Sequence, residues 1–139
     1  MSHSNARNQH SRPSILLVED EQFVREATCR ILESLGFLVL SAGDAVDAVR
    51  IYERCEKPID LLMTDMVLSG ASGQQLAKDI RQRCARIKVL VTSGYGNAEY
   101  DTEDPSAHTY FLAKPYSRRT LLKKIETILG PLAWLHEVA

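Results

Sequence analysis

Short apolar runs alternate with longer amphipathic segments along most of the chain, beginning at Ser14. Five of the runs are almost continuously apolar, which is typical of strands that are covered on both faces of a sheet. The predicted strands are Ile15–Glu19, Phe37–Ser41, Asp60–Thr64, Ile87–Thr92 and Thr109–Ala113.

Four amphipathic segments repeat apolar residues at helical spacing. The first predicted helix is Glu21–Leu35, and the second begins at Asp44 or the residue before it and ends before Pro58. Ser72 is a suitable N-cap for the third helix, and the last helix covers Ser117–Leu129. Strands that alternate with helices of this length predict βαβ units, and therefore an α/β fold with a parallel sheet.

The segment 94–107, between the fourth and fifth predicted strands, differs from the others. It contains two glycines, one proline and four acidic residues, and it has almost no apolar face. We therefore expect the fourth helix of the alternating pattern to be short or irregular.

The length of 139 residues fits one domain, with a core of ordinary size. Residues 1–13 are polar and show no periodicity, which predicts a disordered N-terminal tail. We place the folded domain at residues 14–130 and regard residues 131–139 as a C-terminal extension.

Charge and hydropathy exclude several kinds of partner. A net charge of -1 gives no reason to expect nucleic-acid binding, and no run approaches the roughly 20 apolar residues of a membrane span. The N-terminus lacks the apolar core of a signal peptide, and the three cysteines are an odd number without metal-type spacing. These features predict reduced thiols and a cytoplasmic location.

Polar side chains follow four of the predicted strands at the point where each strand ends. Glu19 and Asp20 follow the first strand, Asp65 the third, Ser93 the fourth and Lys114 the fifth. The carboxyl ends of parallel strands meet at one edge of the sheet, which is where ligands bind in open α/β folds. We therefore expect these five residues to form one site.

Three carboxylates that meet at one place need a cation. Two carboxylates about 4 Å apart repel by several kcal/mol at an effective dielectric constant near 20. A hard divalent ion such as Mg²⁺ prefers oxygen ligands, and Mg²⁺ is commonly bound together with phosphate oxygens. An aspartate in such a site can act as the nucleophile and become an aspartyl phosphate, while lysine and hydroxyl side chains bind phosphate oxygens.

Four short runs of this sequence resemble the motifs of a known protein family. The runs Ile15–Glu21, Asp60–Gly70, Thr92–Gly94 and Phe111–Tyr116 resemble receiver domains of two-component response regulators. The resemblance covers residues 14 to about 130 with all motifs in order. It implies a flavodoxin-like, doubly wound five-stranded parallel sheet with strand order 2-1-3-4-5.

The resemblance also implies a role for each site residue. Asp65 matches the phosphoacceptor, and Lys114 matches the lysine that contacts the phosphoryl group. The implied Mg²⁺ ligands are Asp20, Asp65 and the backbone carbonyl of Val67, with Glu19 acting through water. The implied switch residues are Ser93 and Phe111. A core-packing role for Phe111 is an equal alternative, because either Tyr110 or Phe111 must face the core.

The sequence departs from the usual receiver pattern at three places. Ser69 stands where the family usually has proline, and Glu19 stands where aspartate is common. The irregular segment 94–107 replaces the usual fourth helix. The run Thr92–Tyr95 and this helix-poor segment resemble the receivers of hybrid sensor histidine kinases and of some single-domain regulators.

The function that the resemblance implies is phosphoryl transfer from a histidine kinase or histidine phosphotransferase to Asp65, followed by a conformational signal to a downstream protein. Such a module is not an enzyme, because it catalyses only its own Mg²⁺-dependent phosphorylation and dephosphorylation. A pseudo-receiver that only binds other proteins is one alternative. A flavodoxin-like cofactor binder is another, but it would need a glycine- or hydroxyl-rich phosphate loop where this chain has Glu19–Glu21.

Two structural expectations follow from these assignments. A lysine that must turn back over the sheet edge directly before a proline predicts a cis peptide bond between Lys114 and Pro115, since the cis form of such a bond costs only about 0.5–1 kcal/mol. We also expect the segment 94–107 to be mobile and to respond to phosphorylation through Ser93, because it offers few apolar contacts.

Overall fold

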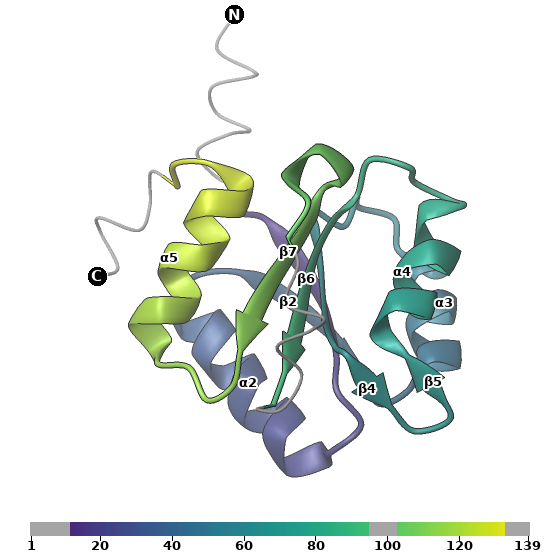
Figure 1. The fold of residues 1–139 in the computed structure, drawn as a ribbon, viewed down its shortest axis with the longest axis horizontal. Coiled ribbons are helices and arrows are strands. Elements are labelled where there is room, and N and C mark those ends of the chain that lie inside the picture. Colours follow the sequence, from purple (N-terminus) through teal and green to yellow (C-terminus); the bar gives the residue numbers. More distant parts are fainter. Residues whose placement is uncertain (1–11, 95–102, 133–139) are drawn as a thin grey trace, which may run out of the picture.

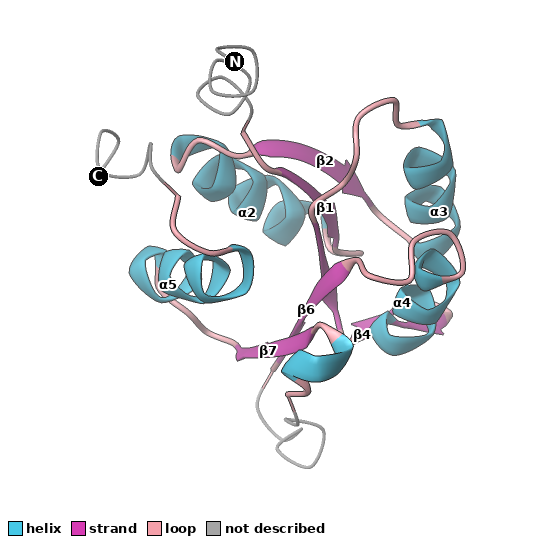
Figure 2. Cartoon of the chain, turned by 90° about the horizontal axis from the view of Figure 1, so that it is seen from above, coloured by secondary structure: helices cyan, strands magenta, loops and turns pink. Residues whose placement is uncertain are grey.

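The computed structural model describes residues 12–94 and 103–132 of the chain. These residues form three layers, with a central sheet and helices packed on both of its faces (Figure 1). Seen from above, α2 (Gln22–Ser34) and α5 (Arg118–Leu129) cover one face, while α3 (Ala45–Arg54) and α4 (Gly73–Arg81) cover the other (Figure 2). The doubly wound α/β architecture is thereby confirmed.

The main sheet has five parallel strands in the spatial order β2-β1-β3-β6-β7. The labels β4 and β5 belong to a separate small hairpin, so this order is the predicted 2-1-3-4-5. The strands are β1 (Ser14–Val18), β2 (Leu38–Ala42), β3 (Leu61–Asp65), β6 (Lys88–Ser93) and β7 (Thr109–Ala113).

Side-chain caps fix the starts of three helices. Asp44 accepts a hydrogen bond from Asp47 N at 2.7 Å before α3, and Ser72 and Ser117 accept equivalent bonds at 3.0 Å before α4 and α5. Such caps satisfy backbone N–H groups that the first turn of a helix leaves without partners. The predicted starts at Asp44 and Ser72 are confirmed, while the predicted end of the first helix, Leu35, lies one residue past the last residue of α2.

Two apolar clusters, one on each face of the sheet, make up the core. One lies beneath α3 and α4, and the other lies beneath α2 and α5. Strands β1 and β3 contribute to both clusters because alternate side chains of a strand point to opposite faces. This explains why these two strands are apolar at most positions before they reach the carboxyl edge of the sheet.

A two-stranded hairpin between β3 and α4 was not predicted. Strands β4 (Val67–Leu68) and β5 (Ala71–Ser72) pair in antiparallel register, and Gly70 turns the chain between them with a φ of +73°. Strands of two residues show no periodicity in a sequence, which is why the pattern missed them. The hairpin holds the chain that follows Asp65 against the sheet edge.

The predicted irregular segment lies partly outside the described residues. Residues 95–102 belong to that outside part, as do residues 1–11 of the predicted tail and residues 133–139 of the predicted extension. The part of the segment that is described contains the short 3-10 helix η2 (Pro105–Ala107). Arg81 of α4 holds this turn by donating hydrogen bonds to the carbonyl oxygens of Ala107 and His108 at 2.9 and 3.0 Å.

Glu103 closes the outer edge of β7. Its carboxylate accepts a hydrogen bond from Phe111 N at 2.9 Å and forms an ion pair with Lys124 of α5. Burial alone would raise the pKa of Glu103, but the bonds from Lys124 and Phe111 outweigh it and hold the pKa below its ordinary value of 4.5. A carboxylate whose pKa is lowered on folding stabilises the fold at pH values above its ordinary pKa. This stabilisation is lost as the pH falls through the lowered pKa of the folded state.

We therefore expect Glu103→Gln to destabilise the protein at pH 7 and to have a smaller effect at pH 3. The glutamine keeps a hydrogen-bond acceptor for Phe111 but cannot form the ion pair with Lys124. Urea unfolding at both pH values measures the difference, with Glu126→Gln as the control because its carboxylate has no ion pair within the described residues. An equal loss at both pH values would show that the ion pair does not stabilise the fold.

None of the helices in the described ranges is long and apolar enough to cross a lipid bilayer.

Candidate functional site

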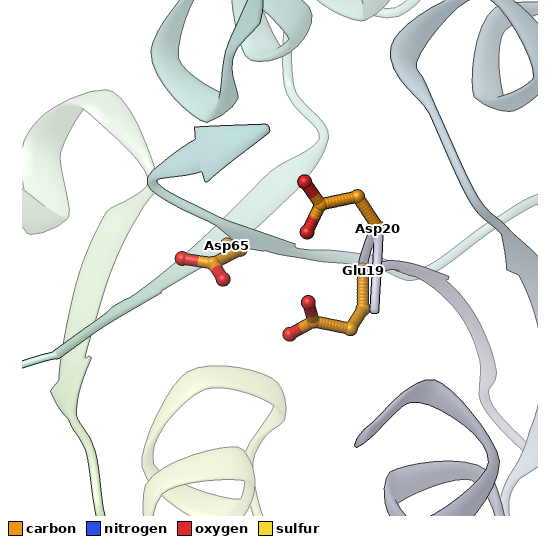
Figure 3. A group of neighbouring side chains, drawn as sticks. All are labelled: Glu19, Asp20 and Asp65. Atoms are coloured by element: carbon orange, nitrogen blue, oxygen red, sulfur yellow. The ribbon is translucent and has the colours of Figure 1, made fainter. Parts of the chain in front are cut away.

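The carboxylates of Glu19, Asp20 and Asp65 meet at the carboxyl edge of the sheet. One oxygen from each lies within 4.8 Å of the others, and Figure 3 shows Glu19 and Asp20 extending toward the side where Asp65 lies. Glu19 and Asp20 follow β1, Asp65 ends β3, and these two strands are neighbours in the sheet. The predicted meeting of the three acids is confirmed.

Backbone hydrogen bonds fix the position of Glu19. Its N–H donates to Ala42 O at 3.1 Å, and its carbonyl oxygen accepts a bond from Arg25 Nη1 at 2.7 Å. One carboxylate oxygen, Oε2, accepts a bond from Glu21 N at 3.1 Å, and the other contacts Lys114. Burial raises the pKa of Glu19, although the hydrogen bonds from Glu21 and Lys114 act in the opposite direction.

Lys114 supplies a positive charge inside the acidic cluster. Its Nζ lies 3.0 Å from Oε1 of Glu19 and 3.1 Å from Oδ2 of Asp65. Burial would lower the pKa of Lys114, but the hydrogen bonds and the charges of the two carboxylates raise it above its ordinary value. The ammonium group is therefore fully charged at neutral pH and bridges two of the three acids.

The predicted cis bond between Lys114 and Pro115 is confirmed. The backbone N–H of Lys114 donates to Ser93 O at 2.7 Å, which ties the ends of β6 and β7 together. Lys114 thus lies at the same edge of the sheet as the acids.

Asp65 stands on a tightly packed turn. Met66 N donates to Thr92 O at 2.7 Å, and Gly73 N donates to Met66 O at 2.8 Å, so the backbone beyond Asp65 is held from both sides. A Cβ atom added to Gly73 would lie 2.2 Å from the carbonyl oxygen of Asp65. Only glycine allows α4 to begin this close to the end of β3.

Ser93 and Thr92 are the two hydroxyl residues at the end of β6, and both are buried. The Oγ1 atom of Thr92 donates to the carbonyl oxygen of Thr64 at 3.5 Å inside the sheet. Thr92 therefore has a partner in the core, whereas Ser93 is the last residue of the strand. This position supports the choice of Ser93 as the hydroxyl of the site.

Phe111 packs in the core and is 7% exposed. It belongs to the apolar cluster beneath α3 and α4, whereas the half-buried Tyr110 packs against the cluster on the other face. The core-packing alternative for Phe111 is therefore confirmed. A switch role for this side chain remains a prediction.

Val67 lies in β4, with its side chain 65% exposed. Its N–H donates to Oδ1 of Asp65 at 3.4 Å, which places its backbone beside the acidic cluster. This placement is compatible with the predicted use of its carbonyl oxygen as a ligand.

Asp20 is held by Ser69, a residue to which the sequence assigned no role in the site. Oδ2 of Asp20 accepts a hydrogen bond of 2.8 Å from the hydroxyl of Ser69, in the turn between β4 and β5. This bond is the main cause that lowers the pKa of Asp20 below its ordinary value. Asp20 is therefore ionised at neutral pH without a metal.

The donor set fits Mg²⁺. Three carboxylates supply oxygen ligands, which this ion prefers, and the single ammonium group of Lys114 leaves the cluster with excess negative charge. No nitrogen or sulfur ligand is included in the cluster, so the set does not resemble a structural zinc site. Asp20 and Asp65 are the acids best placed to bind an ion directly, because both are partly exposed whereas Glu19 is buried.

Three supporting residues were missed at the sequence level as parts of the site: Arg25, Ser69 and Gly73. Arg25 holds the Glu19 carbonyl, Ser69 holds Asp20, and Gly73 allows close packing beneath Asp65. A glycine directly after the helix cap Ser72 was a usable signal for Gly73. Nothing in the sequence alone distinguished Arg25 from the other arginines on helices.

The family model for the response regulator receiver domain matches residues 15–126 of this chain. The chain belongs to that family. The receiver domain is a signalling module of two-component systems, and the fold and the acidic edge of this chain agree with that family.

Relatives support the assignment and differ in length. The chain is 32% identical over 117 residues to Sensor kinase CckA of Brucella abortus. The matched region covers 84% of this chain but only 12% of that protein. It is 30% identical over 117 residues to the response regulator receiver protein CpdR of Brucella abortus, covering 83% of this chain and 95% of that protein. The resemblance thus extends both to a small part of a large kinase and to almost the whole of a small regulator.

A solved structure agrees with this family. The receiver domain of the hybrid histidine kinase CckA matches with a TM-score of 0.70 and 32% identity, covering 84% of this chain and 99% of that one. The likeness to the receivers of hybrid kinases and single-domain regulators, which the motifs predicted, is confirmed.

Proposed function

We propose that this receiver domain, residues 14–130, accepts a phosphoryl group on Asp65 and changes conformation in response. The observation that carries the proposal is the contact between Oδ2 of Asp65 and Nζ of Lys114, 3.1 Å apart, within a cluster of three acids. A carboxylate that needs charge compensation, beside a lysine and a candidate metal site, has the parts that phosphoryl transfer uses.

Asp65 is the proposed nucleophile. One of its oxygens would form a bond to phosphorus as the bond between phosphorus and the donor breaks, which gives an aspartyl phosphate. Asp65 is more accessible than Glu19: its side chain is 17% exposed and that of Glu19 is 6% exposed. Glu19 is therefore less suited to meet a donor from solution.

Charge compensation is the proposed role of the neighbouring residues. Asp20, Asp65 and the carbonyl of Val67 would hold Mg²⁺, and Glu19 would act through a bound water. Mg²⁺ supplies positive charge for the phosphoryl oxygens when it is bound. Lys114 already lies beside Asp65, and its ammonium group can turn from the carboxylate to a phosphoryl oxygen without crossing the site.

A histidine kinase or histidine phosphotransferase is the proposed donor, as the family implies. Phe23 at the start of α2 is 87% exposed and Val67 is 65% exposed. Both apolar side chains lie within four residues of a site acid in the sequence, and exposed apolar side chains grouped near a site favour protein contacts. We propose that they contribute to the surface that meets this donor.

The output is proposed to be a contact with another protein rather than with nucleic acid. The net charge of -1 offers no electrostatic attraction to a phosphate backbone. The three cysteines are free thiols, which supports a reducing, cytoplasmic location.

The conformational change would involve Ser93 and Phe111. Ser93 at the end of β6 is proposed to donate to a phosphoryl oxygen on Asp65. Phe111 packs on the same face as Val91 of β6. A movement of the end of β6 would therefore alter the packing of the proposed aromatic switch.

Incubation of the purified protein with acetyl phosphate tests this function. We expect intact mass spectrometry to show the addition of one phosphoryl group in the presence of MgCl₂ and no addition in excess EDTA, because the acids repel the donor when no cation is bound. A protein that gains no phosphoryl group in MgCl₂ would support the pseudo-receiver alternative. Equal gain in EDTA would contradict the proposed metal requirement.

A further inference from the structure

Ser69 and Asp20 are 49 residues apart in the chain, yet their side chains are joined by a hydrogen bond of 2.8 Å. The bond links the loop after β1, which carries two of the acids, to the hairpin after β3, which carries Val67. Since Asp20 and Val67 are both proposed ligands of the same ion, one hydroxyl fixes the distance between two parts of the metal site.

The turn geometry directs Ser69 toward Asp20. Leu68 and Ala71 pair across the hairpin, so Ser69 and Gly70 are the two central residues of a four-residue turn. A positive φ at the third position, here Gly70, is typical of a type II turn, and this turn type often has proline at its second position. Ser69 occupies that second position, so serine and proline both suit the turn.

Serine offers two donors that proline lacks. The hydroxyl of Ser69 donates to Oδ2 of Asp20, and the backbone N–H of Ser69 also helps to lower the pKa of that carboxylate. The hydroxyl bond is to Oδ2, which leaves Oδ1 as the oxygen of Asp20 that would bind a cation. A carboxylate with one oxygen fixed by a donor keeps the other at a constant orientation.

We propose that Ser69 is a positioning residue that orients Asp20 for Mg²⁺ through the bond to Oδ2. This inference rests on the proposed function, because it assumes that the acidic cluster is the Mg²⁺ site. Residues that hold a ligand from outside the coordination shell commonly change metal affinity by 10–100-fold when they are removed. Ser69 fulfils that role here by joining the two loops that supply the ligands.

Three variants of Ser69 separate the possible contributions. Ser69→Ala removes the hydroxyl and keeps the backbone N–H, Ser69→Thr keeps both, and Ser69→Pro removes both donors while suiting the turn. Ser34→Ala is the matched control, because the hydroxyl of Ser34 donates only to Ile31 O within its own helix.

Titration of each metal-free protein with MgCl₂ at constant ionic strength, followed by NMR chemical shifts, measures the Mg²⁺ affinity without a phosphodonor. We expect Ser69→Ala to bind Mg²⁺ about tenfold more weakly than the wild type. Ser69→Pro should lose at least as much, while Ser69→Thr and Ser34→Ala should bind like the wild type. Urea unfolding in EDTA should show similar stability for all these proteins, which separates positioning from folding.

The possible outcomes distinguish this inference from the proposed function. A wild-type protein that binds no Mg²⁺ would contradict the function itself. A wild type that binds, together with Ser69→Ala or Ser69→Pro of equal or higher affinity, would overturn the role of Ser69 and leave the metal site in place. Weaker binding by Ser69→Thr equal to that of Ser69→Ala would also overturn it, because the hydroxyl would then have no effect of its own.

Discussion

Gly73→Ala is expected to destabilise the fold by about 2–3 kcal/mol, in the upper range for overpacking of a tightly packed position. The new Cβ would lie 2.2 Å from the carbonyl oxygen of Asp65 and 3.0 Å from the Cγ2 of Thr64. The closest atom belongs to the backbone, so no rotation of a side chain can relieve the contact. Either α4 or the end of β3 must move.

Urea unfolding measures this loss, and Gly94→Ala is the matched control. No heavy atom lies within 4 Å of a Cβ at Gly94, and its backbone φ lies outside the left-handed region. We expect the control to have nearly the stability of the wild type. Gly73→Ala of unchanged stability would show that the close packing beneath Asp65 is not needed.

The same variant should also lower the rate of phosphorylation by acetyl phosphate in the fraction that remains folded. Movement at the end of β3 displaces Asp65 from Lys114, which is 3.1 Å away in the wild type. A stability loss with an unchanged rate would separate the two roles of Gly73.

The strands and the acidic edge could be predicted because each rests on a strong local signal. A buried parallel strand is apolar at most positions, and a charged residue directly after such a run is expected at the carboxyl edge of the sheet. Asp65 after Leu61–Thr64 shows this most clearly, and the sheet order then places it beside Glu19 and Asp20. Lys114 directly follows β7, so the same rule placed it at this edge, where it contacts Glu19 and Asp65.

The supporting contacts could not be predicted because they depend on loop geometry. Ser69 reaches Asp20 only because the β4–β5 hairpin folds back over the edge, and strands of two residues leave no pattern in a sequence. Arg25 looks like any other arginine on an exposed helix until its bond to Glu19 is seen. Phe111 and Tyr110 alternate along one strand, so the pattern predicted that one of them is buried without identifying which.

The central claim is that Asp65 accepts the phosphoryl group, and Asp65→Asn is expected to abolish this reaction. An asparagine side chain is close in shape to aspartate but is neutral, so it is a poor nucleophile and gives Lys114 a weaker partner. Asp47→Asn is the matched control, because Asp47 lies on the exposed surface of α3 and pairs only with the nearby Arg50 among the described residues.

Intact mass spectrometry after incubation with acetyl phosphate and MgCl₂ tests this claim most directly. We predict that the wild type and Asp47→Asn gain the mass of one phosphoryl group and that Asp65→Asn gains none. Circular dichroism should show that Asp65→Asn is folded, so that loss of the reaction cannot be attributed to unfolding. A folded Asp65→Asn protein that still gains one phosphoryl group would contradict the account, because the acceptor would then be another residue.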